Sequence, residues 1–304
     1  MNTVDIIKVV FMAIVQGIGE FLPISSSGHL LVVGKLLFSG SGGIDEDEQL
    51  TLAILLHAGT LLSILVIFRR SIWEMLTANL RLIFLLIIGT IPTGIIGVGV
   101  KLVAKKFCPG LTSSLSLTGI GFLITGFLLL NFLGKKNRMK MGPSGSRVEE
   151  AGQIQNDQPM NGQSGFTNCP LKSLRTMTWI DALIIGIFQG VATLPGISRS
   201  GATIVGGILR KLNPEDSAVF SFLLAIPAIA GATVLEMIDF VREKGESFVD
   251  SNFNLYLGGA LISFIIGLIS LAYLMKWLKE GKLSWFAWWL FFIGSVSIIW
   301  GICS

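Results

Sequence analysis

The stretch QGIGEFLPISSSGH at residues 16–29 decides the fold, because its first 13 residues return at residues 189–201 as QGVATLPGISRSG. The constant offset of 173 positions indicates that the chain is a duplication. Only the first copy carries a carboxylate, Glu20, and only the second carries a guanidinium, Arg199. Ionisable side chains inside apolar segments are costly to keep, so the two motifs mark a functional site.

The composition is that of an integral membrane protein. Of the 304 residues, 52% are hydrophobic and only 14% are charged, whereas a soluble domain carries about 25% charged residues. Six apolar runs approach or exceed the roughly 20 residues that cross a bilayer as a helix. They cover residues 50–68, 82–104, 113–134, 216–238, 253–276 and 284–303. The chain starts without a basic leader or a cleavage site, so we expect no removable signal peptide.

Two further apolar stretches, residues 4–38 and 177–210, contain the repeated motif. Each consists of a short helical run, a break rich in Pro, Gly and Ser, and a second short helical run. Neither run is long enough to span a bilayer, and irregular backbone persists at membrane depth only inside protein or beside a wet cavity. Both stretches are therefore predicted to be re-entrant helix-loop-helix hairpins.

The repeat extends beyond the motifs. Ala58-Gly59 recurs as Ala230-Gly231, and Ile95-Ile96-Gly97 has a weaker echo at residues 265–267. The predicted units are a first repeat at 1–134, a polar linker at 135–176 and a second repeat at 177–304. Each repeat holds one hairpin and three spans, and an odd number of crossings inverts the second repeat. The predicted fold is thus an all-α integral membrane protein, an inverted-topology repeat with six transmembrane helices and two re-entrant hairpins.

The basic residues predict the orientation. On this topology 15 of the 23 fall on one side, which should be the cytoplasm of a multi-pass cell-membrane protein. They are Arg69, Arg70, Arg81, Lys135, Lys136, Arg138, Lys140, Arg147, Lys172, Arg175, Arg210, Lys211, Lys276, Lys279 and Lys282. The acidic run at 45–48 and both termini then lie outside. Because topology accounts for the basic residues, we expect no nucleic-acid partner.

Three widely spaced cysteines, Cys108, Cys169 and Cys303, lie in no CxxC or His-rich context. They predict neither a zinc site nor a disulfide framework.

Hydroxyl-rich loops precede the second helical run of each hairpin, at residues 25–28 and 198–203. Free backbone N–H groups and the dipole at a helix N-terminus both favour an oxyanion. For one loop alone, serines that merely cap a helix would be the simpler interpretation. Two such loops that meet at the repeat interface would instead make a phosphate cradle.

Three ionisable residues, Arg199, Glu20 and His29, are candidates for the chemistry. Arg199 needs an anionic partner, which is either a phosphate of the substrate or Glu20 in a structural ion pair. Glu20 is a candidate general base, metal ligand or orienting partner for His29. His29 lies beside three serines and is a candidate acid, base or nucleophile. The other histidine, His57, lies inside the span at 50–68, where a hydrogen-bonded core residue is the expected role.

On these two motifs the chain closely resembles the undecaprenyl-diphosphatase family of bacitracin-resistance membrane phosphatases. The resemblance covers essentially the whole chain. It rests on residues 16–29 and on PGISRSGAT at residues 195–203. It implies hydrolysis of the terminal phosphate of a polyprenyl diphosphate, which regenerates the lipid carrier for cell-wall and surface-glycan synthesis. It also implies an active site that opens toward the outer face.

The resemblance also implies the site residues. By motif position the catalytic residues are Glu20, Ser26, His29 and Arg199. The expected substrate-binding residues are Gln16, Ser25, Ser27, Gly28, Ser198, Ser200, Gly201 and Thr203. The expected cofactor is a divalent cation, Mg²⁺ or Ca²⁺, with Glu20 as its ligand. Many family members carry Glu where this chain has Gln16, which removes one carboxylate from a two-Glu metal site.

The expected partners are the polyprenyl diphosphate lipid and the bilayer, and a homodimer is left open. The competing function is a polyprenyl-phosphate flippase or another secondary transporter, because inverted repeats with broken helices are a general transporter architecture. Acid–base groups beside hydroxyls favour the enzyme, since a transporter needs ligand contacts only.

Overall fold

The computed structural model describes residues 3–38, 46–107, 110, 113–133, 171–244 and 253–303. Within these ranges the chain forms eleven helices, and its only β pairing is an isolated bridge between Lys172 and Leu212. The all-α prediction is therefore confirmed for the described residues. Most of the predicted linker at 135–176 lies outside the described residues, as do Asp45, Cys108 and Cys169.

Five helices are long and apolar enough to cross a membrane. They are α5 (Leu80–Lys106), α6 (Leu115–Leu133), α10 (Pro214–Lys244), α11 (Phe253–Glu280) and α12 (Trp285–Cys303). The sixth predicted span corresponds to α3 (Glu46–Ile67), which passes the same test only together with α4 (Arg69–Thr77), at a 69° bend. No helix is predicted from the sequence between residues 68 and 82, where α4 lies. The segment is instead a short helix with an exposed Trp73.

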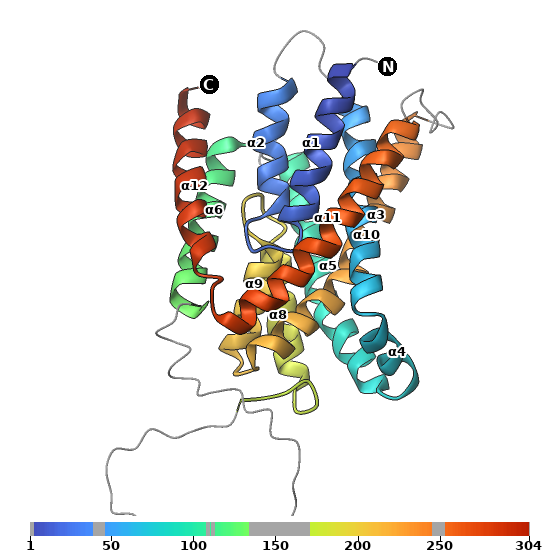
Figure 1. Ribbon diagram of the computed structural model, residues 1–304, viewed down its shortest axis with the longest axis vertical. Coiled ribbons are helices and arrows are strands. Elements are labelled where there is room, and N and C mark those ends of the chain that lie inside the picture. The colour runs from blue at the N-terminus through green and yellow to red at the C-terminus, as the bar shows by residue number, and fades with distance from the viewer. Residues whose placement is uncertain are drawn as a thin grey trace, which may run out of the picture.

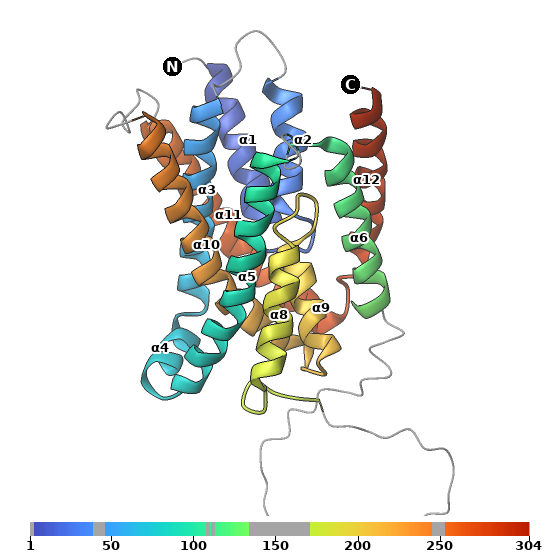
Figure 2. The ribbon, with the colours of Figure 1, turned by 180° about the vertical axis from the view of Figure 1, so that it is seen from behind.

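Both motif-bearing segments have the expected helix, break and helix. In the first, α1 (Thr3–Gly19) is followed by α2 (Ser26–Phe38), and in the second, α8 (Trp179–Val191) is followed by α9 (Arg199–Leu209). The two segments approach each other from opposite ends of the molecule, and their loops meet near its middle (Figure 1, Figure 2). Both chain ends lie at the end from which α1 and α2 descend, and α4 lies at the other end (Figure 1).

The two halves of the chain pack on each other rather than each on itself. The most extensive helix pairs are α6 with α12, α3 with α11, α5 with α8, and α1 with α11. In every one of these pairs, one helix precedes residue 134 and the other follows residue 176. The site where the loops meet therefore depends on both halves.

A buried carboxylate anchors the start of α8. Asp181 closes a capping box with Thr178, accepts hydrogen bonds from Lys172 Nζ at 2.8 and 3.0 Å, and accepts one from Arg210 Nε at 2.7 Å. Burial alone would raise the pKa of Asp181, but the hydrogen bonds from Lys172, Thr178 and Arg210 outweigh it and lower that pKa to about 2. This anchor joins the start of α8 to the end of α9, and so fixes both ends of the second segment.

Candidate active site

Glu20 is the centre of the contact between the two loops. Its side chain is buried, and its Oε1 accepts a hydrogen bond from Arg199 Nη2 in a salt bridge. Its Oε2 accepts from Ser26 Oγ at 2.7 Å and from Gln16 Nε2 at 3.0 Å. The structure thus brings together the two charges that the sequence divides between the repeated motifs.

The two loops repeat the same hydrogen bonds. Ser25 Oγ accepts from the Gly28 N–H at 3.4 Å, and Ser198 Oγ accepts from the Gly201 N–H at 3.2 Å. Each of these serines also lies within 3.4 Å of the hydroxyl two residues later. Capping of the following helix is therefore one role of both serines.

The loops differ in their backbone. Ser25 has a φ of 66°, a left-handed conformation that is rare for a residue other than glycine. In the second loop the left-handed residue is Gly196, and a Cβ atom there would lie 2.0 Å from Thr118 O. Backbone strain at a non-glycine residue is typical of functional loops.

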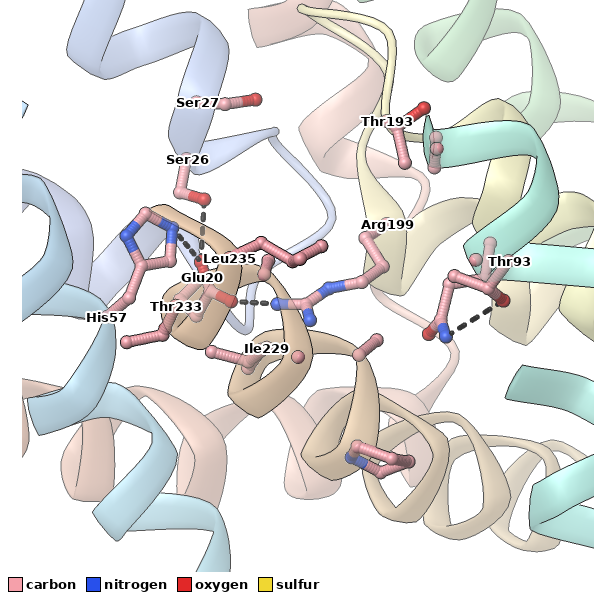
Figure 3. A pocket seen from close by; sticks show the side chains of 18 of the residues that line it. Glu20, Ser26, Ser27, His57, Thr93, Thr193, Arg199, Ile229, Thr233 and Leu235 are labelled. Carbon is pink, nitrogen blue, oxygen red and sulfur yellow. Dashed lines mark hydrogen bonds and ion pairs between the residues drawn. The ribbon is translucent and has the colours of Figure 1, made fainter. Parts of the chain in front are cut away.

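A cavity of about 480 Å³ opens beside the ion pair. It lies between the two loops, α3, α5 and α10, with Glu20, Ser26 and His57 on one side and Thr93 and Thr193 on the other (Figure 3). Arg199 extends between these two polar sides (Figure 3). The cavity is large enough for a phosphorylated headgroup.

Six of the twelve predicted site residues line this cavity: Glu20, Ser25, Ser26, Ser27, Ser198 and Arg199. The other six, which do not line it, are Gln16, Gly28, His29, Ser200, Gly201 and Thr203. Of these, Gln16 supports Glu20, and Ser200 donates to Leu22 O of the opposite loop at 3.3 Å. Thr203 donates to Arg199 O at 2.8 Å.

His29 lies away from Glu20, in a contact with α12. Its Nε2 accepts a hydrogen bond from Trp289 Nε1 at 2.9 Å, and its ring stacks on the Trp289 ring. Its Nδ1 lies 2.9 Å from Ser25 O, which only accepts, so Nδ1 carries the proton. Both ring nitrogens are thus engaged outside the cavity.

His57 occupies the place beside Glu20 that the sequence analysis gave to His29. Its Nε2 lies 3.9 Å from Glu20 Oε2, and its Nδ1 lies 2.8 Å from Ala53 O. His57 is hydrogen bonded, as expected of a core residue, but it also lines the cavity. The signal that could have identified it was the presence of an ionisable group inside a predicted span.

Several further polar residues of the cavity were not predicted, among them Gln189, Thr93 and Thr193. Gln189 Nε2 donates to Thr93 Oγ1 and to Leu224 O, each at 3.3 Å. Gln189 is the repeat counterpart of Gln16, and Thr193 is that of Glu20. The repeat could therefore have identified these two. Thr93 carried no signal, because threonines in helices commonly bond the preceding turn, as Thr93 does at Gly89 O.

The site donors suit a cation only in part. Among the described residues there is no group of three or more His, Cys, Asp or Glu side chains that could hold a metal ion. Glu20 is the one carboxylate at the ion pair, and Arg199 contacts one of its oxygens. These groups fit an ion that shares substrate phosphates and water, because Mg²⁺ is often bound by only one or two carboxylates.

The fold and the site define a multi-pass α-helical membrane protein with a buried, charged cavity where its two halves meet. The chain belongs to the family of the bacitracin resistance protein BacA, whose family model matches residues 9–296. It is 41% identical, over 94% of both chains, to a protein of Rhodopirellula baltica named undecaprenyl-diphosphatase. Proteins of the same name from Alkaliphilus metalliredigens and Carboxydothermus hydrogenoformans are 36% and 35% identical, and each match covers at least 96% of both chains.

Proposed function

We propose that this protein is a phosphatase that hydrolyses undecaprenyl diphosphate to the monophosphate and inorganic phosphate. This reaction recycles the lipid carrier of cell-wall and surface-glycan synthesis. The observation that carries the proposal is the Glu20–Arg199 pair, which joins the two loops beside a polar cavity in an apolar protein. The names of the relatives supply the substrate.

Arg199 and the two helix N-termini bind the diphosphate. The planar guanidinium holds phosphate oxygens in a bidentate fork, and an incoming phosphate competes with Glu20 for it. The N-termini of α2 and α9 add backbone donors and favourable dipoles beside the serines that line the cavity. Substrate binding therefore releases Glu20 from part of its ion pair when a base is needed.

Glu20 is the general base. A nucleophilic oxygen attacks the terminal phosphorus, and its proton passes to Glu20. The bond from that phosphorus to the bridging oxygen breaks, and the bridging oxygen stays on the lipid monophosphate. Arg199 stabilises the charge that develops on the transferred phosphoryl group. Ser26, which donates to Glu20 at 2.7 Å, and water are the two candidate nucleophiles.

His29 keeps its assignment as an acid or base in this proposal, and acting there requires its ring to leave Trp289. Removal of Trp289 tests this role. If His29 must swing to the cavity, Trp289→Phe, which cannot donate to Nε2, should raise kcat or leave it unchanged. A loss of activity in Trp289→Phe with normal folding would instead place the working position of His29 at Trp289.

A divalent cation, Mg²⁺ or Ca²⁺, is proposed to accompany the diphosphate. Glu20 would hold it, with substrate phosphates and water as the other ligands. When bound, the ion would neutralise charge on the diphosphate oxygens. Arg199 already supplies fixed positive charge at the site, so the role of the ion is secondary to that of Arg199.

The proposed membrane topology is an inverted repeat of residues 1–134 and 177–304 in the cell membrane, with re-entrant segments at 4–38 and 177–210. The termini and the mouth of the cavity face outward, where the lipid diphosphate emerges after its glycan is transferred. Support comes from the opposite entry of the two segments and from the shared end of the two termini (Figure 1). One chain supplies both Glu20 and Arg199 of the ion pair.

Cysteine labelling tests this topology. In a cysteine-free background, a membrane-impermeant maleimide should label a cysteine at Asp47 in intact cells, but not one at Gln155. A cysteine at Ser26 should be reached from outside through the cavity. Labelling of position 155 from outside, or of position 26 only from the cytoplasm, would invert the topology.

The competing function is transport of a polyprenyl phosphate. The purified protein should release phosphate from undecaprenyl diphosphate in detergent, where there are no two sides between which a lipid could be moved. The assay is run with Mg²⁺, with Ca²⁺ and with EDTA. Absence of release under all three conditions would favour the transporter.

A further inference from the structure

The geometry points to His57 as a catalytic residue that holds the attacking water between its Nε2 and Glu20 Oε2. This inference rests on the proposed phosphatase function and names its nucleophile. His57 comes from α3, outside both repeated motifs, and its ring lies next to Glu20 on the same side of the cavity (Figure 3).

The hydrogen bond to Ala53 sets the tautomer of His57. Its Nδ1 lies 2.8 Å from Ala53 O, and a carbonyl oxygen only accepts, so Nδ1 carries the proton. In the neutral ring Nε2 is then an acceptor with its lone pair on the cavity side. Glu20 Oε2 is an acceptor too, so the two atoms facing each other have no hydrogen of their own to share.

Nε2 of His57 and Oε2 of Glu20 are 3.9 Å apart, too far for a direct hydrogen bond. A water that donates hydrogen bonds of about 2.8 Å to two acceptors spans about 4.5 Å when both bonds are straight, and the 3.9 Å gap admits it with both bonds bent. The cavity reaches both residues, so water has access to the gap.

The Glu20 carboxylate offers about four lone-pair sites. Gln16 and Ser26 donate to Oε2, and Arg199 donates to Oε1. The remaining site lies on Oε1, so a water at Oε2 takes the place of the Ser26 hydroxyl, which lines the cavity and can rotate away.

A water held by two acceptors points a lone pair away from both of them, into the cavity where the phosphoryl group binds. During attack, a bond forms between the water oxygen and the terminal phosphorus, and the proton that faces Glu20 passes to Oε2. The bond from that phosphorus to the bridging oxygen breaks, and its electron pair remains on the lipid monophosphate. The second proton leaves on the inorganic phosphate, and Glu20 later returns its proton to bulk water.

Three substitutions at one position separate this role from a structural one. His57→Gln places an amide oxygen near the position of Nε2 and can hold the water, whereas His57→Asn retains only the partner of Ala53 O. We expect His57→Ala and His57→Asn to lose about 10- to 100-fold in kcat with little change in KM. His57→Gln should recover most of that loss. The thermal midpoints of the purified variants in detergent control for folding.

Other results would overturn the inference. Activity retained in His57→Asn and lost in His57→Gln would assign His57 to the bond with Ala53 alone. A kcat of His57→Ala that excess Mg²⁺ restores would make His57 a cation ligand. A phosphorylated Ser26 trapped by acid quenching of a single turnover with ³²P-labelled substrate would exclude direct attack by water. If the unsubstituted protein releases no phosphate, the proposed function itself fails.

Discussion

The interface between α3 and α11, here called the closed seam, is tightly packed. The repeat relates it to the interface between α5 and α10, here called the open seam, which borders the cavity. On the closed seam, a Cβ atom at Gly59 would lie 2.3 Å from Ala260 O. Its repeat counterpart, Gly231, has nothing within 4 Å of the same point. Gly231 and Gly94 both line the cavity. The same duplicated Ala-Gly motif thus packs tightly in one copy and lines the cavity in the other.

Cross-seam hydrogen bonds support the same distinction. On the closed seam, Ser63 Oγ donates to Phe264 O at 2.8 Å, and Ser263 Oγ donates to Leu56 O at 3.1 Å. Beside the open seam, Thr93 of α5 instead accepts a hydrogen bond from Gln189 of α8 at the cavity wall. Two hydroxyl-to-carbonyl bonds beside a close glycine contact are typical of stable helix pairs in membranes.

The largest effect is expected from a bulky side chain at Gly59, in the closed seam. Gly59→Leu should abolish the folded protein, because a side chain that starts 2.3 Å from a backbone oxygen forces α3 and α11 apart. The yield of monodisperse protein in detergent measures this. Its matched control is Gly231→Leu, at the counterpart position, which should fold normally. Equal yields for the two variants would remove the distinction between the seams.

The next effect concerns the open seam itself. Gly94→Leu and Gly231→Leu fill the cavity without a clash, so kcat/KM should fall about tenfold or more while the thermal midpoint holds. Gly99→Leu is the control. Gly99 lies on α5, as Gly94 does, and also has open space at its Cβ, but it does not line the cavity. A similar loss of activity in Gly99→Leu would show that the effect arises from the helix and not from the cavity.

A smaller effect is expected at the anchor of α8, the helix that packs on the α5 side of the open seam. Asp181→Asn leaves Lys172 and Arg210 without their shared carboxylate, and because both cations are partly exposed we expect a loss of about 1–2 kcal/mol. The folded pKa of about 2 lies below the usual value, so the charged carboxylate stabilises the fold above pH 4. That contribution should decline as the pH falls from about 4 to about 2.

Thermal midpoints measured between pH 3 and pH 7 check this prediction. The difference in thermal midpoint between the unsubstituted protein and Asp181→Asn should be constant from pH 5 to pH 7 and should become smaller at pH 3. A difference in thermal midpoint that grows on acidification would contradict the lowered pKa of Asp181.

Much of the fold followed from the sequence. Apolar length identified five of the six spans within a few residues of their ends, and the broken segments were located by their Pro, Gly and Ser residues. The α4 helix was missed because its residues, which include Arg69 and Trp73, show no continuous apolar run. The bend between α3 and α4 depends on tertiary packing, which a hydropathy pattern does not encode.

The site was predicted as a pair of loops and not as a full set of side chains. The asymmetry of the repeat offered the contact between Glu20 and Arg199 as one of two alternatives, and the structure contains it. The sequence did not predict that His57, and not His29, lies beside Glu20. Both histidines stand among apolar residues of a helix, so the local sequence does not distinguish them. What distinguishes them is the direction of each ring, toward Trp289 in one case and toward Glu20 in the other.

The smallest expected effect is at Gln16, which donates to Glu20 at 3.0 Å from α1, on the side of the closed seam. Gln16→Glu restores a second carboxylate, so activity should require less Mg²⁺ at half-maximum, with kcat changed by less than about tenfold. Titration of phosphate release with Mg²⁺ measures it. Superimposable titration curves for both forms would exclude a cation at Glu20.

Turnover by Arg199→Lys is the measurement that most directly tests the claim that the Glu20–Arg199 pair is a phosphoryl-transfer centre. Lysine keeps the charge beside Glu20 but lacks the bidentate fork, so kcat should fall about 100- to 1000-fold with a normal thermal midpoint. Near-normal phosphate release by the folded variant would contradict the account, because Arg199 would then only balance the charge of Glu20.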